Sequence, residues 1–395
     1  MPPKWLVSVC VGKEQQNSIR IARERGFSVF GIDNQARPYA VDEVDRFAQA
    51  DIADIDACER LIRSQRLDLV GIDSFVSDAG LVSAAHLRAR FGMDGVTVEQ
   101  AIVLTRKDRM RQKIGELGLE TVAWFASSDL ASLLGWARRV PGPWIIKPVD
   151  SSGSRGVFKI GTLHDLETYF DDSKRFSRTG HVLIEEFLVG TEYSIETIVM
   201  GGNHYWLTSS ERVRLHETTA VEIFTCDLES SKREKVFDQI SQFVQGIGLL
   251  NAPLHSELII TRDGRVVIVD IAGRCGGAMV SEGIVPAATG YALQAAGVSL
   301  AIGEKPPVPA DLRSRYVSLV FLLSSAGRLK AVERDPGSLA VPETRCAIFP
   351  KVGDILGEAI NDGSRVGYVL AVGDDQEQAR NRARLVKDGI KFNLE

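Results

Sequence analysis

The sequence has few cysteines, and none of them lies close to another. Its 395 residues contain five, at positions 10, 58, 226, 275 and 346, without a CxxC pair. Zinc clusters and disulfide frameworks need paired or regularly spaced cysteines, so the sequence argues against both. Unpaired thiols are typical of a reducing compartment, and we therefore expect a cytoplasmic protein.

Long apolar runs and an excess of basic charge are missing as well. No stretch approaches the roughly 20 apolar residues of a membrane helix. The first apolar run, residues 5–11, is too short for a secretory signal and has no small-residue cleavage site. The formal net charge is −5, which gives no general attraction to nucleic acid or to anionic membranes. We expect neither partner, and any basic site must be local.

Alternating strands and helices mark the first hundred residues. Short apolar runs rich in β-branched side chains occupy residues 5–11, 27–33 and 67–73. Helical patterns separate them, and the first of these ends at Gly26. This spacing is typical of βαβ units and predicts an α/β fold that begins with a doubly wound parallel sheet. The first loop has no GxGxxG pattern, so we interpret it as a scaffold or substrate face.

The remainder of the chain indicates a second α/β region and a closing segment. Residues 97–119 have a helical pattern, and strands and helices alternate less regularly from 121 to about 305. A proline-rich stretch, residues 306–311, is the clearest linker. Beyond it, two segments have strand patterns and a charged helix closes the sequence; these segments are residues 316–329, 364–374 and 375–390.

The stretch IIKPVDSSGSRGV, residues 145–157, leads a buried strand into a turn of small polar residues. Lys147 ends the strand, and the turn consists of Ser151, Ser152, Gly153, Ser154, Arg155 and Gly156. Glycines let backbone N–H groups turn toward an anion, and the hydroxyls add donors. Arg155 could cap a distal phosphate. The sequence contains no Walker pattern, and a plain hairpin turn is the alternative interpretation.

A second candidate follows in HVLIEEFLVGTEYS, residues 181–194. Its apolar run ends in Glu185, Glu186, Phe187 and Leu188, and Glu192 comes shortly after. An extended backbone can offer N–H and C=O groups to an adenine edge, and a nearby carboxylate can bind ribose hydroxyls. Two strands with solvated glutamates are the alternative interpretation.

The third candidate is the hairpin HSELIITRDGRVVIVDIAGRCGG, residues 255–277. Asp263-Gly264 is a two-residue turn signal, and such a turn pairs residues whose numbers add up to 527. Glu257 then lies opposite Asp270, where two like charges are destabilising unless something lies between them. Mg²⁺ is the natural candidate, because it usually takes one or two carboxylates plus substrate phosphates. A raised pKa or a one-residue slip of the register is the alternative.

A flexible loop with a guanidinium follows the hairpin. Arg274 stands between glycines, in GRCGG, and arginine suits bidentate recognition of phosphate or carboxylate. Cys275 has no histidine partner nearby in sequence, so we interpret it as a small residue in a tight loop.

Together, in this order and spacing, these stretches resemble the ATP-grasp superfamily over most of the chain. The resemblance implies that Lys107 and Lys147 hold ATP phosphates under a flap formed by residues 151–156. It further implies an adenine hinge at residues 185–188, a ribose carboxylate at Glu192, and magnesium carboxylates at Glu257 and Asp270. Arg274, with Lys147 and Arg155, would stabilise the transferred phosphoryl group. The implied domains are an N-terminal α/β domain (1–105), an ATP-grasp core (106–305, flap lobe about 121–190) and a C-terminal subdomain (306–395).

Within the superfamily, HSEL and DIAGRCGG look closest to ligases that join amino acids or other small carboxylates to amines. Relatives of carbamoyl-phosphate synthase and biotin carboxylase share the layout. Two positions depart from the usual pattern: Asp270, where glutamate is commoner, and Ala272, where many members have asparagine. The number of metal ions, one or two, therefore stays open, as does Mn²⁺ in place of Mg²⁺. His255 faces Ala272 in the predicted register and is a candidate for the missing polar contact.

The resemblance implies an ATP-dependent ligase that forms an amide through an acyl phosphate and releases ADP and phosphate. Substrate contacts are expected from Arg274, Gly276, Gly277 and His255. The stretch 210–225 adds Arg212, Arg214 and His216, although we favour a solvated strand or loop as the interpretation of these three residues.

Other functions stay open at this stage. A carboxylase or a carrier-protein ligase would use the same acyl phosphate step, and a nucleotide-binding protein without catalysis is the rival from another class. A homodimer is compatible with the sequence, and the substrates are small molecules that the sequence does not identify.

Overall fold

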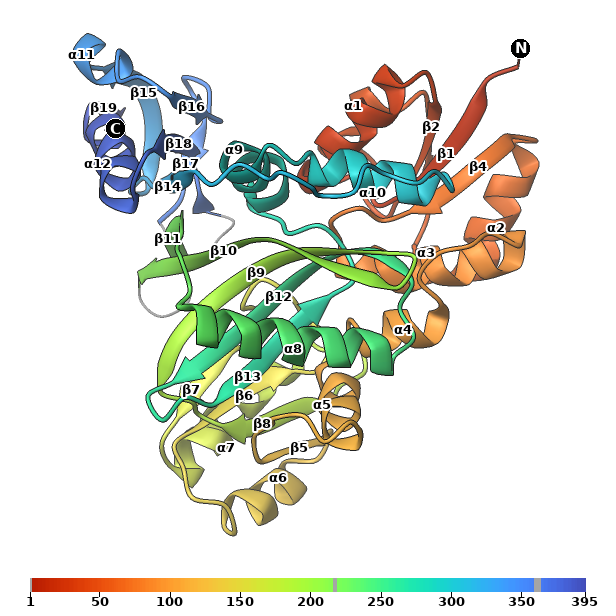
Figure 1. The fold of residues 1–395 in the computed structure, drawn as a ribbon, viewed down its shortest axis with the longest axis vertical. Helices are drawn as coiled ribbons and strands as arrows, with labels where there is room; N and C mark the ends of the chain where they lie inside the picture. Colours follow the sequence, from red (N-terminus) through yellow and green to blue (C-terminus); the bar gives the residue numbers. More distant parts are fainter. Residues whose placement is uncertain (1, 216–218, 359–363) are drawn as a thin grey trace.

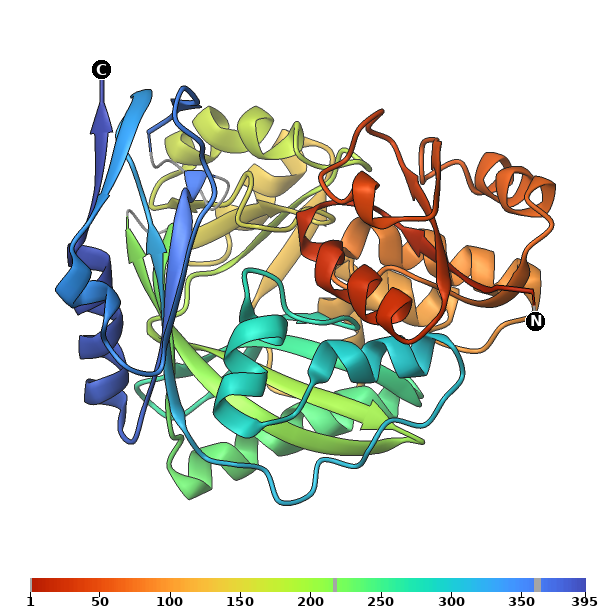
Figure 2. The same ribbon diagram turned by 90° about the horizontal axis from the view of Figure 1, so that it is seen from above.

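The structure is a computed structural model that describes residues 2–215, 219–358 and 364–395. Figure 1 shows the N-terminal part at the upper right, the C-terminal part at the upper left and the central part below them. Helices α9 (Val285–Thr289) and α10 (Leu293–Ala301) run between the two upper parts. Seen from above, the two chain ends lie on opposite sides of the molecule (Figure 2).

The N-terminal part is a parallel four-stranded sheet in the order β3-β2-β1-β4. Its strands are β1 (Lys4–Val9), β2 (Ser28–Asp33), β3 (Arg46–Gln49) and β4 (Asp68–Asp73). Its helices are η1 (Lys13–Gln15), α1 (Gln16–Glu24), η2 (Val41–Glu43), α2 (Ile55–Ser64) and α3 (Asp78–Phe91). The predicted α/β class is confirmed, and three of the four strands were predicted. The short β3 contains only two apolar residues, so it has no apolar run from which a strand could be predicted.

The loops that follow β1, β2 and β4 all meet at one edge of this sheet. Residues from each of the three loops line the main cavity of the molecule. This placement agrees with the rule that open parallel sheets present ligands at the carboxyl ends of their strands. The first loop is therefore a wall of the cavity.

The predicted continuous helix over residues 97–119 is broken in two. The capping box of Thr97 starts α4 (Val98–Val103), and α5 (Lys107–Glu116) begins after an extended Arg106. Because of this break, Lys107 becomes the first residue of a helix, and its N–H donates to the carbonyl of Val149 (2.8 Å). The break therefore ties Lys107 to the segment that leads into the glycine-rich turn.

The lobe at the bottom of Figure 1 is an antiparallel sheet in the order β5-β8-β6-β7, with two helices packed on it. Its elements are β5 (Trp124–Ser127), α6 (Leu130–Ala137), β6 (Trp144–Pro148), β7 (Phe158–Ile160), α7 (Leu163–Lys174) and β8 (Val182–Glu186). The glycine-rich turn connects β6 to β7, which pair with each other, so the turn is also the tip of a hairpin.

An eight-stranded sheet in the order β13-β12-β9-β10-β11-β14-β18-β16 forms the centre of the molecule. Its strands are β9 (Gly190–Met200), β10 (Asn203–Leu215), β11 (Thr219–Thr225), β12 (Asn251–Thr261), β13 (Val266–Ala272), β14 (Tyr316–Leu322), β16 (Thr344–Ile348) and β18 (Gly367–Gly373). Apolar residues of α8 (Ser230–Gly246) cover one face, and those of α9 and α10 cover the other. A π-helical turn, η3 (Val280–Ile284), leads into α9.

The C-terminal segment both extends this sheet and adds a smaller one. Strands β14, β18 and β16 continue the central sheet, while β17 (Ile355–Leu356), β15 (Gly327–Arg334) and β19 (Ile390–Leu394) form a three-stranded sheet. Helices α11 (Pro336–Leu339) and α12 (Gln376–Asp388) complete it. The predicted linker 306–311 contains no helix or strand, but the sheet is continuous across it.

Among the described residues, no single helix is long and apolar enough to cross a membrane. One bent pair, Val280–Thr289 with Leu293–Ala301, has the length and composition for a span, and its apolar residues are divided between two core clusters of the structure.

Candidate active site

The main cavity has a volume of about 960 Å³ and lies where the N-terminal loops, the lobe and the central sheet meet. Nearly all predicted site residues line it. Gly156 and Gly276 do not, because Phe176 and His255 respectively pack against them. His216 lies outside the described residues.

The hairpin of β12 and β13 pairs Glu257 with Asp270 and His255 with Ala272, as predicted. The turn itself is different, because Ile260 pairs with Val266 and Thr261 N–H donates to the carbonyl of Arg265 (3.0 Å). The loop therefore has three residues, with Gly264 at φ +85°. A β-bulge at Val269 restores the predicted register beyond it.

The bulge decides which side chains face the cavity. Val269 and Asp270 both line it, whereas Ile268 and Ile271 on either side are fully buried in the core. A regular strand would alternate its faces. The bulge thus presents Asp270 beside Glu257 on the cavity wall.

Cations surround the two facing carboxylates. Lys107 Nζ lies 3.1 Å from Asp270 Oδ2, and Arg212 lies 2.6 Å from Glu257 Oε1. Burial raises the pKa of Glu257, but the charges of Arg212 and His255 outweigh it and hold that pKa well below its usual range. The side chains of Glu257 and Asp270 are 23% and 33% exposed, so both carboxylates are partly accessible from the cavity.

This donor set fits Mg²⁺ or Mn²⁺ held jointly with phosphate oxygens. Two carboxylates are what Mg²⁺ commonly takes from a protein when substrate phosphates supply the other ligands. The described part of the chain contains no group of three or more His, Cys, Asp or Glu side chains that could hold a metal by themselves. The pair therefore suits a metal that arrives with a nucleotide.

Lys147 belongs to a buried ion-pair cluster. Its Nζ lies 2.5 Å from Glu185, and Arg111 from α5 lies 2.8 Å from the same carboxylate. All three side chains are at most 6% exposed. Burial raises the pKa of Glu185, but the two cations dominate and lower it to about 2. Glu185 thus acts as an internal counter-ion that fixes Lys147 in the cavity wall.

The stretch predicted as an adenine hinge divides into two. Glu185 lies in the middle of the sheet, paired with Ile145 and Trp124, so its backbone is part of the ladder. Phe187 N–H donates to the carbonyl of Pro143 (3.1 Å), and Lys159 lies over the Phe187 ring (4.1 Å). Glu186 N–H likewise donates to the carbonyl of Ala123 (3.0 Å), so the hinge at 185–188 stays a prediction, although all four residues line the cavity.

Glu192, the predicted ribose carboxylate, lies at the start of β9. Arg214 is 2.6 Å from its Oε1, and Arg212 is 3.9 Å away. Both arginines point from β10 into the cavity and are 22% and 15% exposed. Their segment is a strand, but the expectation that this strand is solvated is wrong, because both arginines face the cavity.

The turn 151–156 contains three residues with positive φ angles. Gly153, Ser154 and Gly156 have φ angles of +68°, +56° and +73°, in the left-handed region that glycine adopts without strain. Lys107 Nζ donates to the carbonyl of Ser151 (3.1 Å), and Arg155 donates to that of Ser152 (3.1 Å). The turn therefore lies next to the first predicted phosphate lysine.

Arg274 is held by a residue of the N-terminal part. Its Nε and Nη2 donate to the two oxygens of Asp78 (2.7 and 2.8 Å), and Nη1 donates to the carbonyl of Cys275 (2.9 Å). The charge of Asp78 raises the pKa of Arg274 further despite burial. Asp78 stands in the first turn of α3, which Ser77 caps. This bidentate pair fixes the guanidinium at the cavity wall.

The contacts of His255 are with two carboxylates and a guanidinium. Its Nδ1 bonds to the buried Glu196, and its Nε2 lies 3.4 Å from Glu257 and 3.3 Å from Arg212. Burial lowers the pKa of His255, but Glu196 and Glu257 outweigh it and raise that pKa to about 9. Because both ring nitrogens face protein side chains, the geometry supports a role in orienting Glu257.

Several residues of the site were missed from the sequence. Arg111 could have been found, because it stands four positions after Lys107 and therefore shares its helix face. Asp78, Glu196 and Arg365 gave no local signal, since each reaches the site through contacts between distant segments.

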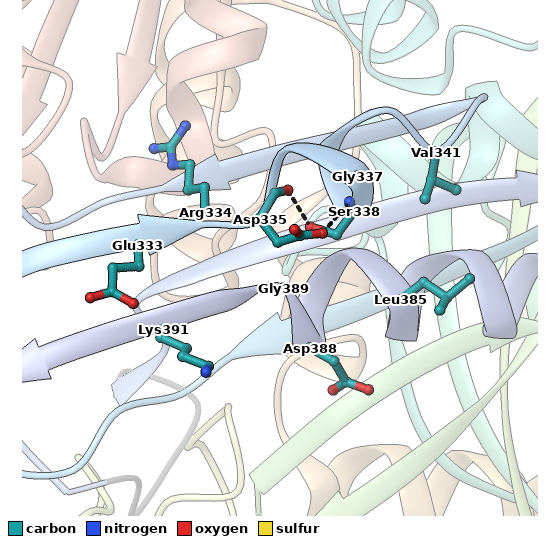
Figure 3. A pocket seen from close by; sticks show the side chains of 10 residues that line it. All are labelled: Glu333, Arg334, Asp335, Gly337, Ser338, Val341, Leu385, Asp388, Gly389 and Lys391. Atoms are coloured by element: carbon teal, nitrogen blue, oxygen red, sulfur yellow. Dashed lines mark hydrogen bonds between the residues drawn. The ribbon is translucent and has the colours of Figure 1, made fainter.

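A second cavity of about 810 Å³ lies in the C-terminal part, between β15, β19 and the ends of α11 and α12. Figure 3 shows its charged side chains and the hydrogen bonds from Ser338 to Asp335 (2.7 and 2.8 Å). None of the predicted site residues lines it.

Comparisons with known proteins agree with this fold and site. An ATP-grasp domain matches residues 140–282, and the C-terminal domain 2 of L-amino acid ligases matches residues 320–395. The crystal structure of an L-amino acid ligase from Bacillus licheniformis superimposes with a TM-score of 0.85 at 18% identity, with both chains fully covered. The chain therefore contains an ATP-grasp domain, and its overall fold is that of the L-amino acid ligase structure. Its C-terminal segment carries the domain characteristic of the L-amino acid ligases.

Two curated relatives differ in what they act on. The L-arginine-specific L-amino acid ligase of Bacillus subtilis is 22% identical over 236 residues, 56% of this chain and 57% of that protein. The formate-dependent phosphoribosylglycinamide formyltransferase of Geobacter metallireducens is 23% identical over 385 residues, 94% of this chain and 92% of that protein. The comparisons therefore identify two domains in this chain, and its relatives differ in their substrates.

Proposed function

We propose that this protein is an ATP-dependent carboxylate–amine ligase that joins a small carboxylate, an amino acid, to an amine and releases ADP and phosphate. One observation carries the proposal: a single cavity holds two facing carboxylates, two lysines, a glycine-rich turn and a fixed arginine. The matched C-terminal domain favours amino acids as substrates.

ATP would lie between the lobe and the central sheet. Lys107 and Lys147 would contact its phosphates under the turn 151–156, whose N–H groups can turn toward an anion. Residues 186–188 would meet the adenine edge, and Glu192 would bind ribose hydroxyls after exchanging its arginine contacts. Members of this superfamily bind ATP with Mg²⁺.

Glu257 and Asp270 would hold Mg²⁺ or Mn²⁺, with His255 orienting Glu257. Such an ion neutralises phosphate charge and polarises the group being transferred. One ion is the simpler expectation, because Ala272 supplies no amide ligand.

The chemistry follows from the leaving group. A carboxylate oxygen attacks the γ-phosphorus of ATP, ADP leaves, and an acyl phosphate forms. The amine then attacks the carbonyl carbon, phosphate leaves and the amide forms. Arg274, held by Asp78, is preorganised to stabilise negative charge in both steps. Closure of the turn would exclude water from the acyl phosphate.

The domain boundaries are part of the proposal. Residues 1–105 would supply one wall and Asp78, residues 106–305 the nucleotide site, and residues 306–395 the far edge of the cavity. The continuous central sheet argues that the last two act as one body.

The test is phosphate release from ATP and Mg²⁺ across a matrix of amino acids, formate, bicarbonate and other small carboxylates, alone and with amines. We expect phosphate release with particular pairs and a product mass equal to the two substrates minus water. Phosphate release that requires formate or bicarbonate would favour formyl or carboxyl transfer, which the relation to the formyltransferase keeps as the second candidate. The proposal would be contradicted if phosphate release required a carrier protein, or if no phosphate were released with any combination.

A further inference from the structure

The glycine-rich turn begins with a carboxylate that faces away from the main cavity. Asp150 stands between Pro148 and Ser151, both of which line the cavity, whereas Asp150 itself does not. A carboxylate that pointed at bound phosphates would also repel them. A direct role in binding the nucleotide therefore does not fit Asp150, and its contacts lie within the lobe instead.

Three donors from one short loop converge on the Asp150 carboxylate. Ser177 Oγ donates to its Oδ1 (2.8 Å), Arg178 N–H donates to the same oxygen (3.2 Å), and Thr179 N–H donates to Oδ2 (3.0 Å). The loop connects α7 to β8, and Ser177 Oγ also accepts from His181 N–H (3.1 Å). Hydrogen bonds to an ionised carboxylate are about twice as strong as neutral ones. Asp150 therefore ties the start of the turn to this loop.

The other end of the turn rests on the same part of the lobe. Gly156 has a φ angle of +73°, and a Cβ atom there would lie 2.9 Å from the Phe176 ring and 3.2 Å from the carbonyl oxygen of Ser173. Glycine adopts this conformation without strain and leaves room for the ring. Both ends of the turn are therefore fixed to one stretch of chain, residues 173–179.

The tip of the turn is built differently from its ends. Gly153 and Arg155 are exposed, and Arg155 Nε donates within the turn, to the carbonyl of Ser152 (3.1 Å). Gly153 has a φ angle of +68°, and a glycine can change its backbone conformation at little steric cost. Lids commonly close by φ/ψ changes at a few residues. A turn with fixed ends and an exposed tip can therefore close by moving the tip alone.

We propose that Asp150 is a positioning residue for this turn: its carboxylate holds the base of the turn against residues 177–179, so that the tip closes over the phosphates in one defined place. The inference rests on the proposed ligase function, in which the turn covers ATP and the acyl phosphate. With a loose base, water reaches the acyl phosphate, returns the free acid and releases phosphate. ATP is then consumed without formation of an amide.

The experiment compares wild type with Asp150→Asn in two measurements: the affinity for MgATP by calorimetry, and the phosphate released per amide formed with the substrate pair found in the matrix above. The wild type should give a phosphate-to-amide ratio near one. Asp150→Asn keeps the shape of the side chain but turns an NH₂ group toward the donors. We expect roughly 10-fold weaker binding of ATP, as for one lost charge-assisted hydrogen bond, and a ratio at least about threefold higher.

The ratio distinguishes positioning from a general loss of stability. Unfolded molecules make neither phosphate nor amide, so a merely destabilised variant loses rate but keeps the ratio. Ser177→Ala removes one of the three donors and should raise the ratio less than Asp150→Asn does. The double variant should resemble Asp150→Asn alone, because both changes break the same contact. If Asp150→Asn does not fold, Ser177→Ala decides by the same measurement.

The matched control is Asp172→Asn, the same change at a 45% exposed side chain of α7 that pairs with the neighbouring Arg175 (3.2 Å). It should keep the ratio and the ATP affinity of the wild type. An unchanged ratio in Asp150→Asn would overturn the inference, whatever its affinity for ATP, and so would an equal rise in Asp172→Asn. Wild-type protein that binds MgATP but forms no amide with any pair would refute the proposed ligase, and the inference with it.

Discussion

Two sides of the same cavity hold their cations in different ways. Around Glu185, both Arg111 and Lys147 pair with a buried carboxylate of the protein itself. On another wall of the cavity, Lys13 and Arg365 lie over the rings of Phe349 and Phe321. A buried carboxylate fixes a cation through its charge and direct hydrogen bonds, whereas an aromatic ring orients a cation through its face. The first arrangement depends on the charge of a single side chain, and the second on the packing of aromatic rings.

The largest effect is expected when the charge of Glu185 is removed. Glu185→Gln leaves two buried cations without their carboxylate, so we expect a loss of about 3–5 kcal/mol in the free energy of unfolding. ATP affinity should fall as well. Urea unfolding and ATP titration measure the two effects. The adjacent Glu186→Gln, whose side chain is 37% exposed, should change stability by no more than about 1 kcal/mol.

Lowering the pH should remove the contribution of ionised Glu185 to the free energy of unfolding. The pKa of Glu185 falls from an ordinary 4.5 to about 2 in the folded protein. Its contribution is therefore present above pH 4.5 and is lost as the pH falls toward 2, up to about 3 kcal/mol. The gap in stability between wild type and Glu185→Gln should narrow over this range. A gap that stays constant from pH 7 to pH 3 would show that the charge of Glu185 does not act as described.

The Arg274–Asp78 pair is the second internal counter-ion of the site. Asp78→Asn removes the charge that holds the guanidinium, and we expect kcat to fall roughly 10- to 100-fold because catalytic positioning is lost. The KM for ATP should stay close to that of the wild type. Asp42→Asn serves as the control, because the Asp42 side chain lies in the same N-terminal part and is 82% exposed. An unchanged kcat in Asp78→Asn would show that Arg274 needs no clamp.

Metal dependence should show a smaller, graded effect. Glu257→Gln keeps the shape of the side chain but removes an anionic oxygen, so the Mg²⁺ concentration for half-maximal activity should rise at least roughly tenfold. Asp263→Asn lies at the turn of the same hairpin, away from the cavity, and should leave the Mg²⁺ requirement unchanged. Equal responses of the two variants would argue against a metal at Glu257.

The smallest effect is expected in the C-terminal cavity. Lys391→Gln changes a charge that faces neither side of the main cavity, so activity should stay the same and stability should move by at most about 0.5 kcal/mol. A clear loss of activity would show that the C-terminal cavity contributes to catalysis.

The sequence predicts the facing carboxylates for partly the wrong reason. Asp263-Gly264 predicted a two-residue turn, whereas the loop has three residues and a bulge at Val269 compensates. The longer loop shifts the register by one residue, and the bulge shifts it back before Glu257. Turn chemistry is local and can be predicted, but a bulge depends on packing of Ile268 and Ile271 into the core, which the sequence alone does not show.

The other features of the site follow the same rule: those with a local signal in the sequence were predicted, and those that depend on distant segments were not. Strands, the glycine-rich turn and Lys147 were predicted because their signals lie within a few residues. The break before Lys107 was not, because a continuous helical pattern hides the extended Arg106. Arg365 could not be found at all, since only the continuation of the central sheet through β14 and β18 brings it to the cavity.

The Arg274–Asp78 pair also has a consequence for how the protein is made. Its two residues stand 196 positions apart, so the ion pair forms only after the N-terminal part and the hairpin of β12 and β13 have folded and docked. Domains generally fold as units, N-terminal first, during synthesis. A growing chain that already contains the glycine-rich turn and Lys147 therefore still lacks the arginine that would make bound ATP reactive. Full competence should appear only when most of the chain has been synthesised, which spares an unfinished protein from consuming nucleotide.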